Sequence, residues 1–199
     1  SLIVLGVFVT GKSPYKNVLV NELLLDKYGK KMHKSKGNAI EPFTLMEKYG
    51  ADTIRWYLPY VSPTWTPLKF DEEGLKEVHS KFFNPLKNTY SFFQMYANTD
   101  GIDIAECNVE VKDREEIDKW LLSRYNSLLK VVTEGYEEYD LNKVVRNITN
   151  FVSDDLSNWY IRRCRNRFWG SELDNSKKAV YITTYEVLVG ISKIIAPVI

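Results

Sequence analysis

The stretch DDLSNWYIRRCRNRFW, residues 154–169, ends a longer segment, 141–169, in which one set of residues recurs at steps of three and four. Steps of this size place residues on a single face of an α-helix. The first half of the set is apolar and predicts a face that packs into a core, whereas the second half is polar. The whole set is Val145, Ile148, Val152, Asp155, Trp159, Arg162 and Asn166.

The polar end of this predicted helix allows two interpretations. In the first, Asp155 forms a buried pair with an arginine that fixes the helix register, and the other arginines are solvated. In the second, this end leaves the core and either meets RNA phosphate or docks onto a neighbouring domain, for which arginines beside an aromatic residue are suited. The arginines concerned are Arg162, Arg163, Arg165 and Arg167.

Helical periodicity extends over most of the chain from Asp71 onward. The predicted fold class is therefore mainly α, a helical bundle whose first two helices are joined by the polar loop TDGIDIAECNVEVKD. The expected helices cover about 71–97, 114–138, 141–169 and 175–196.

The residues before Asp71 follow a different pattern, in which short apolar runs alternate with turn-forming residues. Proline suits the first turn of a helix and glycine its end, so these residues mark the expected boundaries. In order, the expected elements are a strand-length run NVLVNELLL at 17–25, a turn DKYG at 26–29, a helix from Pro42 to Gly50, a helix at 51–60 and a rigid connector SPTWTP at 62–67.

Composition limits the partners of such a chain. It has 199 residues, of which 44% are hydrophobic, enough for a real core. Lysine and arginine number 27 against 26 aspartate and glutamate residues, so any anion-binding surface must be local. The two cysteines, Cys107 and Cys164, lack the spacing of metal ligands and are expected to be reduced cytosolic thiols.

Both ends of the chain are apolar. The first residues, SLIVLGVFVTG, are too few to span a bilayer and lack the basic flank of a signal peptide. We expect them to form a buried element cut from a longer chain. The last residues, ISKIIAPVI, stop without a polar cap, so the chain is expected to be a fragment.

The segment GKKMHKSKGNAIEP, residues 29–42, places four lysines between glycines and small polar residues, with no apolar period. A run of like charges is ordinarily a solvated loop. Lysine is also a compact cation on a flexible stem, which a mobile loop can deliver to an anionic ligand and withdraw again. The four residues are Lys30, Lys31, Lys34 and Lys36.

KMHKS at 31–35, followed by KGN, resembles the Lys-Met-Ser-Lys-Ser signature of class I aminoacyl-tRNA synthetases. YGADTIRWYL at 49–58 looks like the next helix of that family. RWYLPYVSPTWTPLKFDEEGLKEV and the stretch at 154–169 resemble the isoleucyl enzymes rather than their valyl, leucyl or methionyl relatives. The resemblance implies two parts: residues 1–70 as the C-terminal edge of a Rossmann-type catalytic domain, and 71–199 as the helical bundle that opens the anticodon-binding domain.

The resemblance also implies roles for individual residues. Amino-acid activation builds negative charge on the phosphates of ATP, and positioned cations contribute most where such charge develops. Lys31 and Lys34 match the two signature lysines and, with Ser35, are the implied catalytic residues. Met32, Lys34 and Gly37 are the implied ATP contacts. The implied tRNA contacts are Arg162, Arg163 and Arg167.

One residue departs from the signature. Its third position is normally serine, and here it is His33. A histidine side chain could add a phosphate contact, because it can carry a charge near neutral pH, or it could point to solvent.

The resemblance implies ATP, Mg²⁺, isoleucine and tRNA(Ile) as ligands of a monomeric, cytoplasmic parent enzyme that does not bind membranes. A His-x-Gly-His-type element, the isoleucine pocket, an editing domain and a Cys-rich zinc site do not occur in these residues. The parent is therefore expected to make isoleucyl-tRNA, and this chain alone to be inactive. Two alternatives remain at this point: a stand-alone helical RNA-binding module, and a structural bundle with a solvated basic loop.

Overall fold

The structure is a computed structural model that describes the backbone of residues 1–199 and every side chain except that of Lys34. Helices dominate it, and they are joined by short 3₁₀ turns and by two π-helical segments. The elements are α1 (Leu2–Thr10), β1 (Leu24–Leu25), the 3₁₀ turn η1 (Lys34–Lys36), α2 (Pro42–Tyr49), α3 (Ala51–Val61), β2 (Leu68–Lys69), α4 (Glu72–Val78), the π-helix η2 (His79–Phe83), α5 (Asn84–Asp100), the 3₁₀ turns η3 (Ile104–Glu106) and η4 (Val111–Asp113), α6 (Glu116–Glu137), α7 (Leu141–Asn150), the π-helix η5 (Phe151–Ile161), α8 (Arg162–Trp169) and α9 (Asn175–Ile195).

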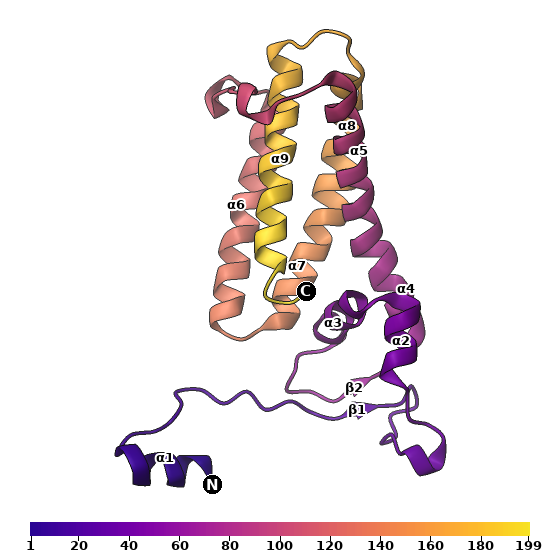
Figure 1. Cartoon of the computed structure of the whole chain (residues 1–199), viewed down its shortest axis with the longest axis vertical. Helices are drawn as coiled ribbons and strands as arrows, with labels where there is room; N and C mark the ends of the chain where they lie inside the picture. The colour runs from indigo at the N-terminus through magenta and orange to yellow at the C-terminus, as the bar shows by residue number, and fades with distance from the viewer.

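The long helices run side by side as a bundle, with α2, α3 and the two short strands below its base (Figure 1). One long rod is built from α4, η2 and α5, and another from α7, η5 and α8. The fold is therefore mainly α, and the predicted helical bundle is confirmed. Across the described residues, no helix is both long enough and apolar enough to cross a membrane.

Carboxylate caps explain why the predicted helix starts lie within a few residues of the observed ones. A side-chain oxygen just before a helix satisfies backbone N–H groups that have no partner inside the helix. At α6 the cap is reciprocal, because Glu115 and Asp118 each bond the other's backbone N–H. The remaining caps of the long helices are Asp71 at α4, Asp140 at α7 and Asp174 at α9.

The predicted strand at 17–25 is mostly wrong. Only its last two residues form a strand, which pairs in parallel with β2 in the register Leu24 to Leu68 and Leu25 to Lys69. Strand structure needs a run of hydrogen bonds to a neighbour, and before Leu24 the backbone cross-links are the Glu22 N–H to the Thr64 carbonyl at 2.9 Å and the Leu68 N–H to the Leu23 carbonyl at 3.1 Å. The apolar run is therefore extended but largely unpaired.

The first residues are not buried in this chain, and their expected burial within a longer chain stays a prediction. They form α1, whose side chains are exposed; Phe8, for example, is 88% exposed. Figure 1 shows α1 beyond the end of an extended stretch, away from the bundle. Pro14 packs against Gly6, and the apolar side chains of α1 stay exposed.

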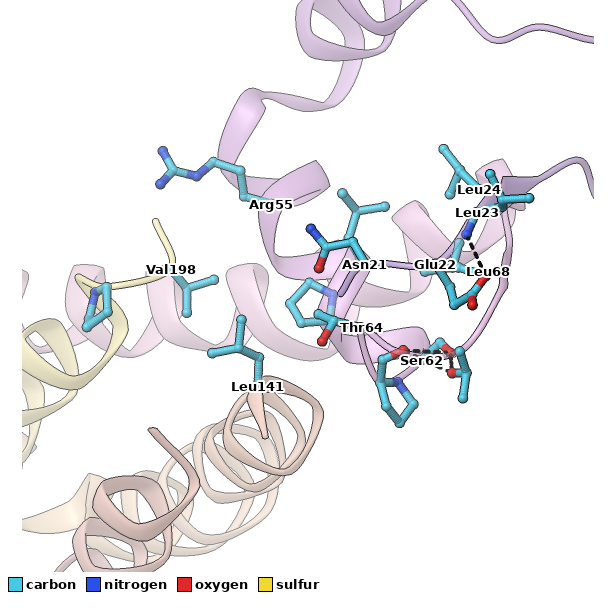
Figure 2. Close-up of a pocket in the computed structure, with 15 residues that line it drawn as sticks. Asn21, Glu22, Leu23, Leu24, Arg55, Ser62, Thr64, Leu68, Leu141 and Val198 are labelled. Carbon is cyan, nitrogen blue, oxygen red and sulfur yellow. Dashed lines mark hydrogen bonds between the residues drawn. The ribbon is translucent and has the colours of Figure 1, made fainter. Parts of the chain in front are cut away.

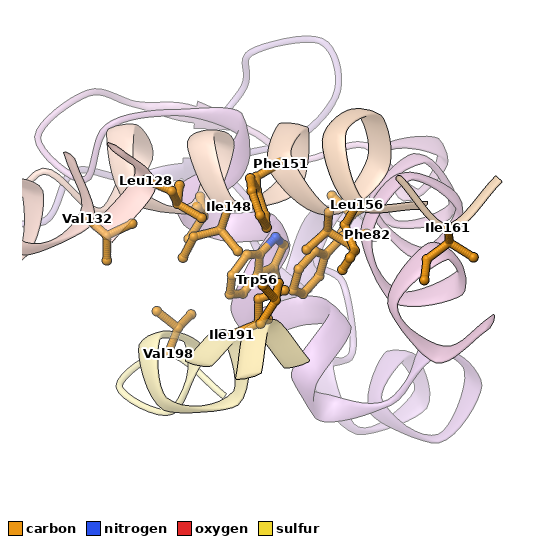
Figure 3. Close-up of a cluster of buried hydrophobic side chains, with 14 of the residues drawn as sticks. Trp56, Phe82, Leu128, Val132, Ile148, Phe151, Leu156, Ile161, Ile191 and Val198 are labelled. Atoms are coloured by element: carbon orange, nitrogen blue, oxygen red, sulfur yellow. The ribbon is translucent and has the colours of Figure 1, made fainter. Parts of the chain in front are cut away.

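The core ties α3 to the base of the bundle. Trp56 of α3 stacks on Phe82 of η2, with ring centroids 4.0 Å apart and planes 1° from parallel. Its indole N–H donates to the Thr149 hydroxyl of α7 at 3.0 Å. Both aromatic side chains are 0% exposed, and Figure 3 shows them among aliphatic residues from the long helices. Residues on either side of Asp71 thus share one core.

The predicted helix at 141–169 is present, and the apolar half of its predicted stripe, Val145, Ile148 and Val152, is buried as expected, whereas the second half does not follow the buried face. A step of four in an α-helix turns about 40° beyond a full circle, so such a set drifts off one face. The i→i+5 bonds of η5 put more residues in each turn, which keeps steps of four together. Trp159 is consequently 46% exposed. One buried row runs at steps of four through Ile148, Val152, Leu156, Tyr160, Cys164 and Phe168, and the neighbouring buried residues are Val144, Val145, Thr149, Phe151 and Ile161.

Candidate functional site

The lysine segment begins in a tight antiparallel turn. Leu25 bridges Lys31 across it, and the Asp26 backbone N–H donates to the Lys30 carbonyl at 2.9 Å. Gly29 adopts φ 81°, a conformation that glycine reaches without the steric penalty of a side chain. The predicted turn DKYG is therefore confirmed, and it fixes where the lysines begin.

A carboxamide braces the segment from its other end. The Asn38 amide nitrogen donates to Asp26 Oδ2 at 2.9 Å and to the Lys31 carbonyl at 3.1 Å. Its carbonyl oxygen accepts the His33 backbone N–H at 2.9 Å. We call Asp26 and Asn38 the loop brace. Sequence analysis missed both residues; the available signals were the aspartate that opens the turn and the asparagine of KGN.

Besides its bond with Asn38, Asp26 holds the backbone of the turn itself. Its Oδ1 accepts the backbone N–H groups of Tyr28, at 3.0 Å, and Lys30, at 2.8 Å. The hydrogen bond from Asn38, together with the Lys30 N–H, lowers the pKa of this carboxyl below its ordinary value. Asp26 therefore stays ionised at neutral pH, as an acceptor-only group.

The predicted residues of the signature lie around this brace. Met32 is half-buried and packs against the hydrophobic core, whereas Lys31, His33 and Ser35 are exposed. Gly37 adopts φ 68° and is exposed. The predicted role of Lys34 concerns a side chain that lies outside the described part of the structure.

The cavity nearest the brace is acidic. It has a volume of about 560 Å³, and Asp26 and Asn38 lie in its wall together with carboxylates that follow β2. Four carboxylates outnumber the two lysines of this wall, Lys27 and Lys76, so the cavity has a net negative lining that repels a nucleoside triphosphate. The acidic residues in its wall are Asp26, Asp71, Glu72 and Glu73.

A second cavity, of about 440 Å³, lies between the extended segment and the bundle. Figure 2 shows Leu141 and Val198 on the bundle side, with Asn21 and Thr64 across from them. None of residues 29–42 lines it, and its walls are largely apolar. It is therefore separate from the lysine segment.

The arginine end of the long helix divides into an exposed part and a buried part. Arg162, Arg163 and Arg165 are exposed. The Arg163 guanidinium lies 3.9 Å from the Trp159 ring centroid, in cation–π contact. The ring centroid of Trp159 lies 6.3 Å from that of Trp120 in α6. We call Arg162, Arg163 and Trp159 the arginine surface.

Arg167, the third tRNA contact that the resemblance implied, does not belong to that surface because its side chain turns into the bundle. Its side chain is 13% exposed, and both terminal nitrogens donate to Asp118 of α6 at 2.8 Å. The Asp118 side chain is 0% exposed and also accepts the Tyr160 hydroxyl at 2.6 Å. Burial disfavours the charged guanidinium, but the bonds to Asp118 outweigh it and raise the pKa of Arg167.

A buried aspartate–arginine pair is present, as one interpretation predicted, but Asp155 is not its aspartate. Asp155 does not pair with Arg162; it bonds Arg124 of α6, with 2.9 Å between Nη2 and Oδ2. The deeply buried pair is Arg167 with Asp118 instead. The π-helical turns set which residues face α6, and the three- and four-residue stripe could not show this.

Metal binding has no visible basis in the described residues, among which no group of three or more His, Cys, Asp or Glu side chains could hold an ion.

Two family models match parts of this chain. Residues 1–71 match the family model "tRNA synthetases class I (I, L, M and V)", and residues 118–199 match "Anticodon-binding domain of tRNA ligase". A LeuRS of Agrobacterium radiobacter, solved in a ternary complex with tRNA and LeuAMS, superimposes with a TM-score of 0.73 at 16% identity, over 99% of this chain and 23% of that one. The chain thus belongs to the class I aminoacyl-tRNA synthetases.

Within that class, the similar sequences are isoleucine–tRNA ligases. The relative from Bacteroides thetaiotaomicron is 50% identical over 92% of this chain and 16% of its own length. The relative from Bacillus thuringiensis is 46% identical over 99% of this chain and 19% of its own length. The chain therefore spans less than a fifth of the curated relatives that it matches.

A second solved structure supports the fold. Methionyl-tRNA synthetase of Mycobacterium tuberculosis, in complex with methionyl-adenylate, superimposes with a TM-score of 0.70 at 20% identity. The superposition covers 88% of this chain and 34% of the methionyl-tRNA synthetase chain. At this identity the likeness speaks for the fold alone.

Proposed function

We propose that this chain is the part of an isoleucine–tRNA ligase that carries the lysine loop of the catalytic domain and opens the tRNA-binding bundle. The observation that carries the proposal is KMHKS in a braced turn directly ahead of the helices, in a chain 43–50% identical to such ligases. Residues 1–70 are the edge of the catalytic domain in this proposal, and 71–199 are the bundle. The match of one family model to 1–71 supports that division.

The lysines act on the charge that appears during activation. When the isoleucine carboxylate attacks the α-phosphate of ATP, negative charge builds on the phosphate oxygens and on the departing pyrophosphate. A cation placed there stabilises the transition state more than the ground state. By resemblance, Lys31 and Lys34 supply that charge, and Ser35 donates a hydrogen bond to the nucleotide. Lys31 and Ser35 are exposed, as such contacts require.

The backbone around the lysines contributes as well. Met32 packs into the core and anchors the loop, and it is the proposed neighbour of the adenine. Gly37, with its positive φ and open surroundings, lets the backbone approach the nucleotide closely.

The arginine surface is the proposed tRNA contact. Arg162 and Arg163 are exposed cations beside an aromatic ring, a combination that suits phosphate and sugar contacts. Such contacts position tRNA without reading its bases. Arg167 is left out of this role because Asp118 and Ser176 occupy its donors.

Class I synthetases use ATP, and the resemblance carries the rest of the proposal. Mg²⁺ accompanies ATP, isoleucine and tRNA(Ile) are the other substrates, and the enzyme works as a monomer in the cytoplasm.

The test compares a full-length ligase containing this chain with the chain alone. The full-length protein should catalyse isoleucine-dependent pyrophosphate exchange and charge tRNA(Ile), because the missing parts of the site are then present. The chain alone should fold but remain inactive, since one loop cannot position both substrates. A full-length protein that binds RNA in a salt-sensitive way, yet shows no exchange, would instead favour a stand-alone RNA-binding module.

A further inference from the structure

The lysine segment is shaped by one side chain that bonds three separate groups. Asn38 contacts the turn at Asp26, the carbonyl of Lys31 and the backbone N–H of His33. A carboxamide offers donors on its nitrogen and an acceptor on its oxygen, as a backbone peptide does. Asn38 therefore pairs with the loop backbone on both sides of Met32, in the manner of a neighbouring strand.

We propose that Asn38 and Asp26 are positioning residues of the activation reaction, which hold the signature backbone so that its lysines point at the nucleotide. The proposal rests on the proposed function of the chain as part of a synthetase. Neither residue is given a contact with substrate; both act through the backbone of residues 31–33.

Fixing this backbone matters because the lysines follow it directly. The Lys31 carbonyl is itself bonded to Asn38, and the turn η1, which begins at Lys34, starts one residue after His33. Met32 packs against the hydrophobic core. The loop is thus held by the brace on one side and by Met32 on the other. A lysine on a fixed backbone loses less freedom on reaching the phosphates than one on an open loop.

The brace also gives a physical reason why histidine is accepted at the third signature position. Residue 33 contributes its backbone N–H to Asn38, whereas its side chain is exposed. A serine or a histidine supplies the same N–H. The position therefore tolerates the exchange without losing the contact that shapes the loop.

The first test uses pyrophosphate exchange by the full-length ligase. Asn38→Ala removes the three hydrogen bonds of the Asn38 side chain and should lower kcat about 5- to 30-fold, the factor that corresponds to a net loss of about one to two kcal/mol. The KM for isoleucine should stay within about twofold, because ground-state binding of the amino acid does not use the loop. Asn98→Ala, an exposed asparagine on α5, is the matched control and should leave kcat unchanged.

Rescue separates a specific link from general damage. Asn38→Asp places a second carboxylate opposite Asp26, across a link of 2.9 Å, and should lower kcat further than alanine does. Combining it with Asp26→Asn restores one donor facing one acceptor, and kcat should recover above that of either single variant. An unchanged kcat in Asn38→Ala, or a double variant no better than the single ones, would overturn the proposal.

A structural measurement keeps the proposal independent of the activity. In the chain itself, hydrogen exchange at the His33 amide should accelerate in Asn38→Ala and stay unchanged in Asn98→Ala. If His33 exchanges at the same rate in all forms, the brace does not exist in solution. If the wild-type ligase shows no isoleucine-dependent exchange, the proposed function fails, while the amide result still stands or falls by itself.

Discussion

Arg167 and Asp118 form the most deeply buried ion pair of the bundle's described side chains. The two residues come from α8 and α6, and the guanidinium also donates to the Ser176 hydroxyl at the start of α9. Three helices therefore meet at one charge pair. Such a pair is a weak source of net stability, but removing one partner leaves the other charge buried and unpaired.

Arg167→Ala should lower the free energy of unfolding of the chain by about 3–5 kcal/mol, because Asp118 is then a buried charge without its counterion. Arg163→Ala, on the same helix but exposed, should cost no more than about 1 kcal/mol, the worth of its contact with Trp159. Urea denaturation followed by circular dichroism measures both. Equal losses in the two variants would show that the pair is not the determinant of stability at this end.

At the level of elements, the arginine surface depends on how η5 rotates the helix. Leu156 and Tyr160 turn inward, and Trp159 and Arg163 turn outward. The exposed cations then lie together on α8, where a phosphate backbone can reach them.

Replacing Arg162 and Arg163 with alanine in the full-length ligase should weaken tRNA binding and flatten the logarithmic salt dependence by about one to two units, one for each lost phosphate contact. Isoleucine activation without tRNA should not change. The control replaces two exposed lysines elsewhere, Lys87 and Lys193, and should leave the salt slope as it was. If the control flattens the slope equally, overall charge explains the binding and the arginine surface does not.

The long helices could be predicted because their signals are local. Caps such as Asp140 and Asp174 and a period of three to four residues lie within a few positions of the feature they predict. The buried face of η5 could not be read in this way, because π-helical geometry changes the period itself. The partner of Arg167 lies 49 residues away, so no local pattern indicated it.

The candidate site shows the same limit. The lysine signature and the turn before it are local, and the sequence predicted them. The Asp26–Asn38 bond joins residues 12 apart and exists only once the turn brings them together. The strand predicted at 17–25 is largely absent because an apolar run of that length predicts a strand whether or not a neighbouring strand is present to pair with it.

For the whole molecule, buried tyrosines couple stability to alkaline pH. Burial raises the pKa of Tyr136 to about 12, and burial with the nearby Asp118 raises the pKa of Tyr160 well above its ordinary value. The hydroxyls are protonated hydrogen-bond donors in the fold; that of Tyr136 donates to the Ile194 carbonyl at 2.7 Å. The tyrosines with raised pKa values are Tyr57, Tyr125, Tyr136, Tyr160 and Tyr181.

These raised tyrosine pKa values predict that the free energy of unfolding falls at alkaline pH. The folded chain holds the tyrosine protons more tightly than the unfolded chain, whose tyrosines titrate near pH 10. The stabilising contribution is therefore complete below about pH 10 and declines as the pH rises toward 12. Urea midpoints measured from about pH 9 to about pH 12 should fall, and less steeply in Tyr136→Phe. A flat profile would contradict the burial of these hydroxyls.

The central claim is that lysines of the KMHKS segment stabilise the charge that develops on ATP when isoleucine is activated. Isoleucine-dependent pyrophosphate exchange in two variants of the full-length ligase tests this claim most directly. Lys34→Ala should lower the exchange rate roughly a hundred- to a thousandfold, the loss typical of one transition-state contact worth about 2.7–4 kcal/mol. Lys36→Ala, two residues away and outside the signature pair, should lower it far less. Equal losses in the two variants would contradict the account, because they would mean that bulk charge rather than a placed lysine explains the segment.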